Sequence, residues 1–170
     1  MIGDRWGVTD VETRATYGCD SYVTSPSLEA WRGVTVNTTP DQLWSWLVQV
    51  RLAPYSYDWI DNLGRKSPRE LRNLPDPTPG DPFTATAGQP LGRVLAVEHQ
   101  VQLTAQIMGT HMSYQLTPID DRRTRLVLKV AAPQSMRLAA PLLSVGDLVM
   151  ARRQLLNFKH HAENSANIGR

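Results

Sequence analysis

The 170-residue sequence predicts an α+β fold, in which a curved antiparallel sheet wraps around a long C-terminal helix. Three observations lead to this prediction. Apolar and polar residues alternate with a period of two from Leu91 onward, which is typical of strands. One strand and two short helices are expected before that region, and a long helix with a wide apolar surface follows it. A helix of that kind needs a partner that encloses it, and the sheet is the simplest one.

The first expected strand covers 31–36, and a helix follows it. Thr38 or Thr39 is placed to cap this helix, with Pro40 at its first position. Apolar residues then recur at helical spacing: Leu43, Trp44, Leu47, Val48 and Val50. A second short helix is expected over 58–63, and another helical turn near 67–70. The proline-rich stretch 75–90 indicates irregular loop or edge strand.

Four alternating segments predict an antiparallel meander: 93–98, 101–108, 111–118 and 124–131. Gly109-Thr110 and Asp120-Asp121 are expected to form hairpin turns between them. Pro141 opens the final helix, which is expected to end near Glu163. Apolar residues occupy much of its circumference: Leu142, Val145, Leu148, Val149, Ala151, Leu155, Leu156 and Phe158.

Composition and length predict one domain over 1–170, in which 1–30 form an extended N-terminal arm. Trp6 and Tyr17 are expected to hold that arm against the body, because free exposed rings are unfavourable. The formal net charge is only +2, and no stripe of basic and aromatic residues is present, so nucleic acid is not an expected partner. The basic cluster Arg65, Lys66, Arg69 and Arg72 is interpreted as a solvated face, with an anion site as the alternative.

The chain start and the single cysteine favour a cytoplasmic protein. Cys19 has no second cysteine with which to form an internal disulfide. No apolar signal segment follows the first residues. The most apolar late stretch, 138–151, is interrupted by Pro141, Gly146 and Asp147, so it is not expected to span a bilayer.

An aromatic cluster supplies most candidate ligand-binding residues. Tyr55, Tyr57 and Trp59 lie within five residues of one another, with Asp58 among them. Rings that carry hydroxyl or indole donors beside one carboxylate are typical of a cavity wall. The alternative is that these rings belong to the core.

Three further candidate ligand-binding residues lie outside that cluster: His111, Tyr114 and Arg152. His111 begins a strand near Tyr114 and would act as an acid or base if it faced a cavity; the alternative is a histidine bonded to backbone or water. Arg152 falls on the apolar side of the final helix, where it would meet an acidic ligand, Asp58 or Asp61. The alternative for Arg152 is that its stem covers the core while its charge reaches water. No metal-ligand spacing, nucleophile elbow or nucleotide-binding loop is present, so neither metal nor cofactor is expected and catalytic residues stay unassigned.

Three blocks of the sequence support a family resemblance. They are Arg-Trp-Gly-Val-Thr-Asp at 5–10, Trp-Ser-Trp-Leu-Val-Gln at 44–49 with the aromatic segment 55–63, and Met-Ala-Arg-Arg-Gln-Leu-Leu-Asn-Phe-Lys at 150–159. The chain resembles the START-like, helix-grip (SRPBCC) superfamily of polyketide cyclase/dehydrase and lipid transport proteins, and within it uncharacterised actinobacterial members. This resemblance implies a helix-grip fold with an internal cavity, in a superfamily that includes carriers, sensors and enzymes.

Three functions follow as alternatives. The first is a binding or carrier protein for a small hydrophobic or amphipathic molecule held between the sheet and the final helix. The second is a cofactor-independent enzyme of the cyclase/dehydratase type, which would use one acid or base from His111, Asp58 or Tyr57. The third is an interaction module whose own side chains fill the cavity.

Overall fold

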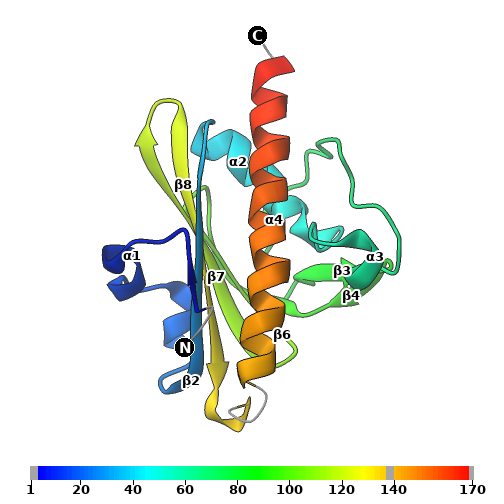
Figure 1. Cartoon of the computed structure of the whole chain (residues 1–170). Helices are drawn as coiled ribbons and strands as arrows, with labels where there is room; N and C mark the ends of the chain where they lie inside the picture. Colours follow the sequence, from blue (N-terminus) through cyan, green and yellow to red (C-terminus); the bar gives the residue numbers. More distant parts are fainter. Residues whose placement is uncertain (1–3, 137–139, 169–170) are drawn as a thin grey trace.

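The computed structural model describes residues 4–136 and 140–168, and it has an α+β architecture. A six-stranded sheet has the order β1-β2-β8-β7-β6-β5, and the long helix α4 (Ala140–Ile168) packs on one face of it (Figure 1). Its strands are β1 (Arg5–Trp6), β2 (Pro26–Val36), β5 (Arg93–Glu98), β6 (Gln102–Ile107), β7 (Thr110–Asp120) and β8 (Arg123–Pro133). Neighbouring strands are antiparallel except β1, which pairs with β2 in parallel. The sheet is therefore mixed, and the prediction of a purely antiparallel sheet was wrong at this edge.

Strand β2 is longer than the six residues predicted for it. It pairs with β8 from Pro26 to Val36, and Leu28 and Ala30 are already buried on the same side as Val34. The polar residues Ser27 and Glu29 alternate with these positions, so period-two alternation was a usable signal for the longer strand.

The first predicted helix consists of two parts. Helix α2 (Pro40–Leu47) begins at Thr39, whose hydroxyl accepts a hydrogen bond from the Gln42 amide, and a 3₁₀ turn (Val48–Arg51) continues it. Helix α3 (Asp58–Asp61) is a single turn, and no helix forms at 67–70. Strands β3 (Thr84–Thr86) and β4 (Gln89–Leu91) form a separate two-stranded sheet within the proline-rich stretch.

The sequence predicted an extended N-terminal arm, but the segment is not simply extended. It contains helix α1 (Asp10–Arg14) and a 3₁₀ turn (Gly18–Ser21). Helix α1 forms because Thr9 and Glu12 make a capping box, in which each side chain accepts a hydrogen bond from the other's backbone amide. In Figure 1, α1 and α4 lie on opposite sides of the sheet.

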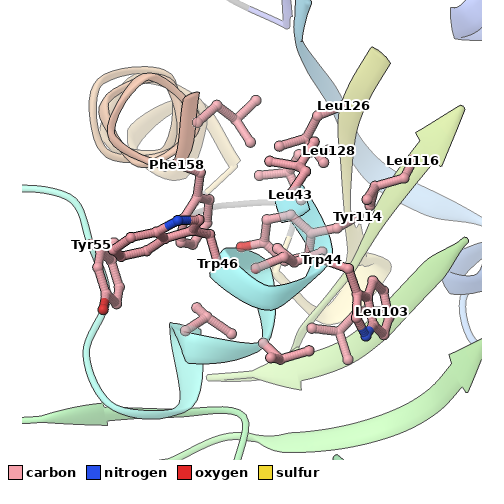
Figure 2. Packing of buried hydrophobic residues seen from close by; sticks show 14 of the residues in the cluster. Leu43, Trp44, Trp46, Tyr55, Leu103, Tyr114, Leu116, Leu126, Leu128 and Phe158 are labelled. Carbon is pink, nitrogen blue, oxygen red and sulfur yellow. The ribbon is translucent and has the colours of Figure 1, made fainter. Parts of the chain in front are cut away.

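Apolar side chains cover both faces of the sheet, because alternate residues of a strand point to opposite faces. The inner cluster, between the sheet and α2 and α4, includes Leu43, Trp46, Leu128 and Phe158, which Figure 2 shows pointing toward one another. The outer cluster consists of Tyr17, Cys19, Val23, Trp31, Val127 and Ala131. Tyr17 thus holds the N-terminal segment in place as predicted, and Trp6 packs against the inner cluster.

Helix α4 is unbroken and extends beyond its predicted end at Glu163. The Trp46 indole N–H donates to Ser165 Oγ over 3.1 Å, which holds the last turns against α2. The Asn37 amide also donates to the Glu163 carboxylate over 2.8 Å. Among the residues described, no helix has both the length and the apolar character needed to cross a membrane.

Candidate functional site

A cavity of about 500 Å³ lies between the inner face of the sheet, helix α4 and the segment 54–61. Its volume is within the range of small-molecule sites, which is roughly 300–1,000 Å³. Its walls are mostly apolar, and they include Phe83, Ile107, Met112, Leu128, Val130 and Ala151. The cavity can therefore accept an apolar molecule without leaving many polar groups unpaired.

The cavity exists because α4 lies to one side of the sheet. The helix makes most of its sheet contacts with β2 and far fewer with β8. Ile107, at the end of β6, and Met112 and Tyr114, near the start of β7, face 54–61 and the β3–β4 hairpin instead. These shorter elements do not fill the space as a helix would.

A chain of hydrogen bonds fixes α4 to the cavity wall. The Tyr114 hydroxyl donates to Gln154 Oε1 over 2.6 Å, and Gln154 Nε2 donates to the Pro54 carbonyl over 2.6 Å. One turn further along, Asn157 Nδ2 donates to the Tyr55 carbonyl over 2.9 Å. Helix, strand and loop are thereby held in one arrangement around the cavity.

The polar end of the cavity is formed by Ser56 and Asp61. The Ser56 hydroxyl donates to Asp61 Oδ2, whereas Asp61 Oδ1 is buried and has no hydrogen-bond partner among the described residues. Burial raises the pKa of the Asp61 carboxyl, and the Asp58 charge adds to that rise, although the Ser56 hydrogen bond opposes it. Tyr55 turns the chain at this point with a φ of 56°, a left-handed conformation that is rare for a bulky residue. The loop thus presents one acidic group to a largely apolar space.

The aromatic cluster mostly borders a different, polar cleft of about 510 Å³ on the other side of this loop. Tyr55, Tyr57, Asp58 and Trp59 all line it, together with basic residues that include Arg69, Arg153 and His160. The prediction that these residues line a cavity wall therefore applies to this cleft rather than to the sheet–helix cavity.

The individual members of the cluster differ in their surroundings. The Tyr55 ring is buried against Phe158, and burial raises the pKa of its hydroxyl to about 12. The Arg153 guanidinium lies over the Tyr57 ring at 5.6 Å. The Asp58 carboxylate accepts hydrogen bonds from the Ser67 amide and hydroxyl at 3.0 and 2.5 Å, and Trp59 is 74% exposed.

Of the three candidates outside the cluster, only Tyr114 lines the sheet–helix cavity. His111 lies on the opposite, outer face of β7, since its neighbour Met112 faces the cavity. There the His111 ring stacks on Tyr22 at 5.9 Å, and burial together with the Arg93 charge lowers its pKa. The idea of His111 as a cavity acid or base therefore does not fit the register of β7.

Arg152 is exposed on α4, and its guanidinium carbon lies 4.8 Å from the centroid of the Trp6 ring. Among the described residues no ion pair joins Arg152 to Asp58 or Asp61, and its exposed guanidinium fits the alternative in which the charge reaches water. Within the described residues, no group of three His, Cys, Asp or Glu side chains is placed to hold a metal ion.

Sequence reasoning did not select Ser56, Asp61 or Gln154 as site residues. Ser56 and Asp61 belong to the same segment as the aromatic cluster, so the segment was a usable signal. Gln154 lies in the final block of the family resemblance, but its role depends on contacts with Tyr114 and Pro54 that only the fold creates.

Comparison with known proteins shows the fold and nothing finer. No protein-family model matches the chain, and no curated protein matches it. The structure is similar to a structural-genomics protein from Nitrosomonas europaea, with a TM-score of 0.54 and 10% identity over 84% of this chain and 99% of that chain. It is also similar to one from Thermobifida fusca, with a TM-score of 0.50 and 19% identity over 78% of this chain and 92% of that chain. At such identities the likeness shows an α+β fold of this kind alone.

Proposed function

We propose that this chain is a START-like, helix-grip protein that binds or carries a small hydrophobic or amphipathic molecule between the sheet and α4. The observation that carries the proposal is the cavity of about 500 Å³ with largely apolar walls. The resemblance of three sequence blocks to that superfamily supports it, as does the long C-terminal helix packed on the sheet.

The polar end of the cavity favours a ligand with one hydrogen-bonding group. Asp61 Oδ1 has no partner among the described residues, and a buried oxygen without a partner is unfavourable. A ligand hydroxyl or amide would donate to it. The Tyr114 hydroxyl already donates to Gln154, so we assign it to positioning the wall.

The second candidate function is a cofactor-independent enzyme of the cyclase/dehydratase type. Asp61 favours it, since burial raises the pKa of its carboxyl and makes the carboxylate a stronger proton acceptor. Asp61 replaces the earlier candidates His111, Asp58 and Tyr57 in this role, because none of those three lines the cavity. The open volume argues against the third alternative, a cavity filled by side chains.

The proposal is tested by reducing the cavity volume. N-Phenyl-1-naphthylamine, a neutral apolar dye, should bind the purified protein with saturable fluorescence enhancement. Ala151→Leu adds apolar volume on the cavity side of α4, and we expect it to weaken dye binding about tenfold, the loss of roughly 1.4 kcal/mol. Val149→Leu is the matched control, because Val149 is exposed on the same helix and should leave binding unchanged.

The outcomes separate the functions. Equal dye binding by both variants, or none by the parent protein, would overturn the proposal. Native mass spectrometry of the purified parent protein should in addition show a co-purifying small mass that Ala151→Leu displaces. Turnover of polyketide-like substrates that is abolished by Asp61→Asn, with dye binding retained, would favour the enzyme over the carrier.

A further inference from the structure

A separate cleft of about 750 Å³ lies between the 3₁₀ turn after α2, the segment 62–74 and the β3–β4 hairpin. Four basic residues line it, namely Arg51, Arg65, Lys66 and Arg72, and no acidic residue does. The chain has 16 acidic and 18 basic residues, so its composition does not require this separation. Like charges held together repel one another, and their grouping needs a physical reason.

Three of the four cations are not neutralised by the protein. Arg65, Lys66 and Arg72 are exposed, and within 4–136 and 140–168 no carboxylate lies within ion-pair distance of their side chains. Arg51 differs, since it donates to the Pro75 carbonyl and lies 3.8 Å from the Asp81 carboxylate. The cleft therefore keeps three free positive charges.

Two buried amide side chains fix the backbone that carries these charges. Asn62 is 2% exposed; its Nδ2 donates to the Arg65 carbonyl and its Oδ1 accepts from the Ala87 amide over 2.8 Å. Gln49 is fully buried and accepts a hydrogen bond from the Arg72 amide. A solvated basic face would not need such anchoring, whereas a binding site gains affinity from it.

We infer that this cleft binds a phosphorylated anion. Guanidinium groups present paired N–H donors that match phosphate oxygens, and lysine adds a point charge. Three free cations suit a group with several negative charges better than a single carboxylate. The source of the phosphate is either a small soluble molecule or the headgroup of an acidic lipid, and the two share the chemistry that the cleft recognises.

This inference goes beyond the proposed function and does not depend on it. The cleft and the sheet–helix cavity share one lining residue, Thr84, and its hydroxyl donates to the Val50 carbonyl. Ala151→Leu should therefore weaken dye binding in the cavity while leaving anion binding in the cleft unchanged.

The test uses inorganic tripolyphosphate, titrated into the full chain by calorimetry at low ionic strength. The double variant Arg65→Gln/Arg72→Gln should lose about tenfold or more in affinity, and both side chains are exposed, so folding should be retained. The control Arg14→Gln/Arg122→Gln removes the same charge at exposed positions outside the cleft and should stay within about twofold of the parent protein.

A second arm identifies the source of the phosphate. Flotation with phosphatidylcholine vesicles, with and without phosphatidylglycerol, is carried out on the same variants. If the cleft variant loses vesicle binding and the control variant does not, the source is a lipid headgroup. If the cleft variant loses tripolyphosphate binding but not vesicle binding, the source is a soluble molecule. Equal losses in the cleft and control variants, or no binding of either probe by the parent protein, would overturn the inference.

Discussion

The two faces of the sheet are covered by different means, and the inner face borders an open cavity. On the outer face, the N-terminal segment lies directly on the strands, and the Lys129 ammonium pairs with Asp20 at 2.6 Å and Glu29 at 2.8 Å. The same ammonium lies over the rings of Tyr17 and Trp31. On the inner face, α4 spans from β2 toward a loop and leaves an apolar space with Asp61 at its end. The covering element, rather than the strands, thus decides where a ligand fits.

A second ion pair joins the N-terminal segment to the outer face. Arg125 Nε donates to Glu12 Oε1 over 2.6 Å. Burial alone would raise the pKa of the Glu12 carboxyl, but hydrogen bonds from Arg125 and Thr9 hold it below its usual value. The outer face is therefore closed by matched charges, and the inner face by apolar packing around a space.

The largest expected effect comes from removing the Lys129 ion pairs on the outer face. Lys129→Met keeps most of the stem volume but leaves the Asp20 and Glu29 carboxylates without their cation. Lys129 is 4% exposed, so we expect the free energy of unfolding to fall by about 3 kcal/mol, measured by urea denaturation. Arg123→Met is the control, because the Arg123–Asp120 pair is exposed and should contribute less than about 1 kcal/mol.

Lys129→Met also tests whether the outer face affects ligand binding at the inner face. Under conditions in which Lys129→Met is folded, dye binding in the inner cavity should equal that of the parent protein. A loss of dye affinity in the folded variant would mean that the outer face shapes the cavity, and the two faces would not be independent.

A smaller effect is expected at the inner face from Asp61→Asn. The folded-state pKa of Asp61 is raised by burial, so the stability linked to its protonation is full at acidic pH, below the unfolded pKa. That stability is lost as the pH rises through the folded pKa. The neutral amide avoids the loss, so Asp61→Asn should be more stable than the parent protein at pH 7, and this advantage should vanish near pH 3. Urea denaturation at several pH values measures it, and an advantage that does not change with pH would contradict the assignment.

The meander and the final helix were predictable, because their signals are local. Period-two alternation marks β5 to β8, and a wide apolar surface marks α4. The face on which His111 lies was not predictable, since both faces of β7 contact apolar clusters and alternation does not distinguish them. Asp61 gains its place from the local fold of 54–61, where the Ser56 hydroxyl donates to it, and Gln154 gains its place from a hydrogen bond across to β7.

The parallel pairing of β1 with β2 and the β3–β4 hairpin were not predicted, because neither has a clear local signal. Strand β1 has two residues, too few for any periodicity, and it exists because Arg5 and Trp6 lie beside β2. The β3–β4 turn uses Ala87 and Gly88, both with positive φ, where an asparagine or aspartate before the glycine would have indicated the hairpin.

The smallest expected effect concerns Arg152, which lies at the margin between the helix and the N-terminal strand. Its guanidinium stacks on Trp6, and an exposed contact of this kind contributes about 0.5–1 kcal/mol. Arg152→Met should therefore lower the free energy of unfolding by about 0.5 kcal/mol, and it should leave dye binding unchanged. A double-mutant cycle with Trp6→Leu isolates the contact, and we expect a coupling free energy of about 0.5 kcal/mol. Zero coupling, together with weaker binding of acidic dyes by Arg152→Met, would instead return Arg152 to the role of a ligand-facing cation.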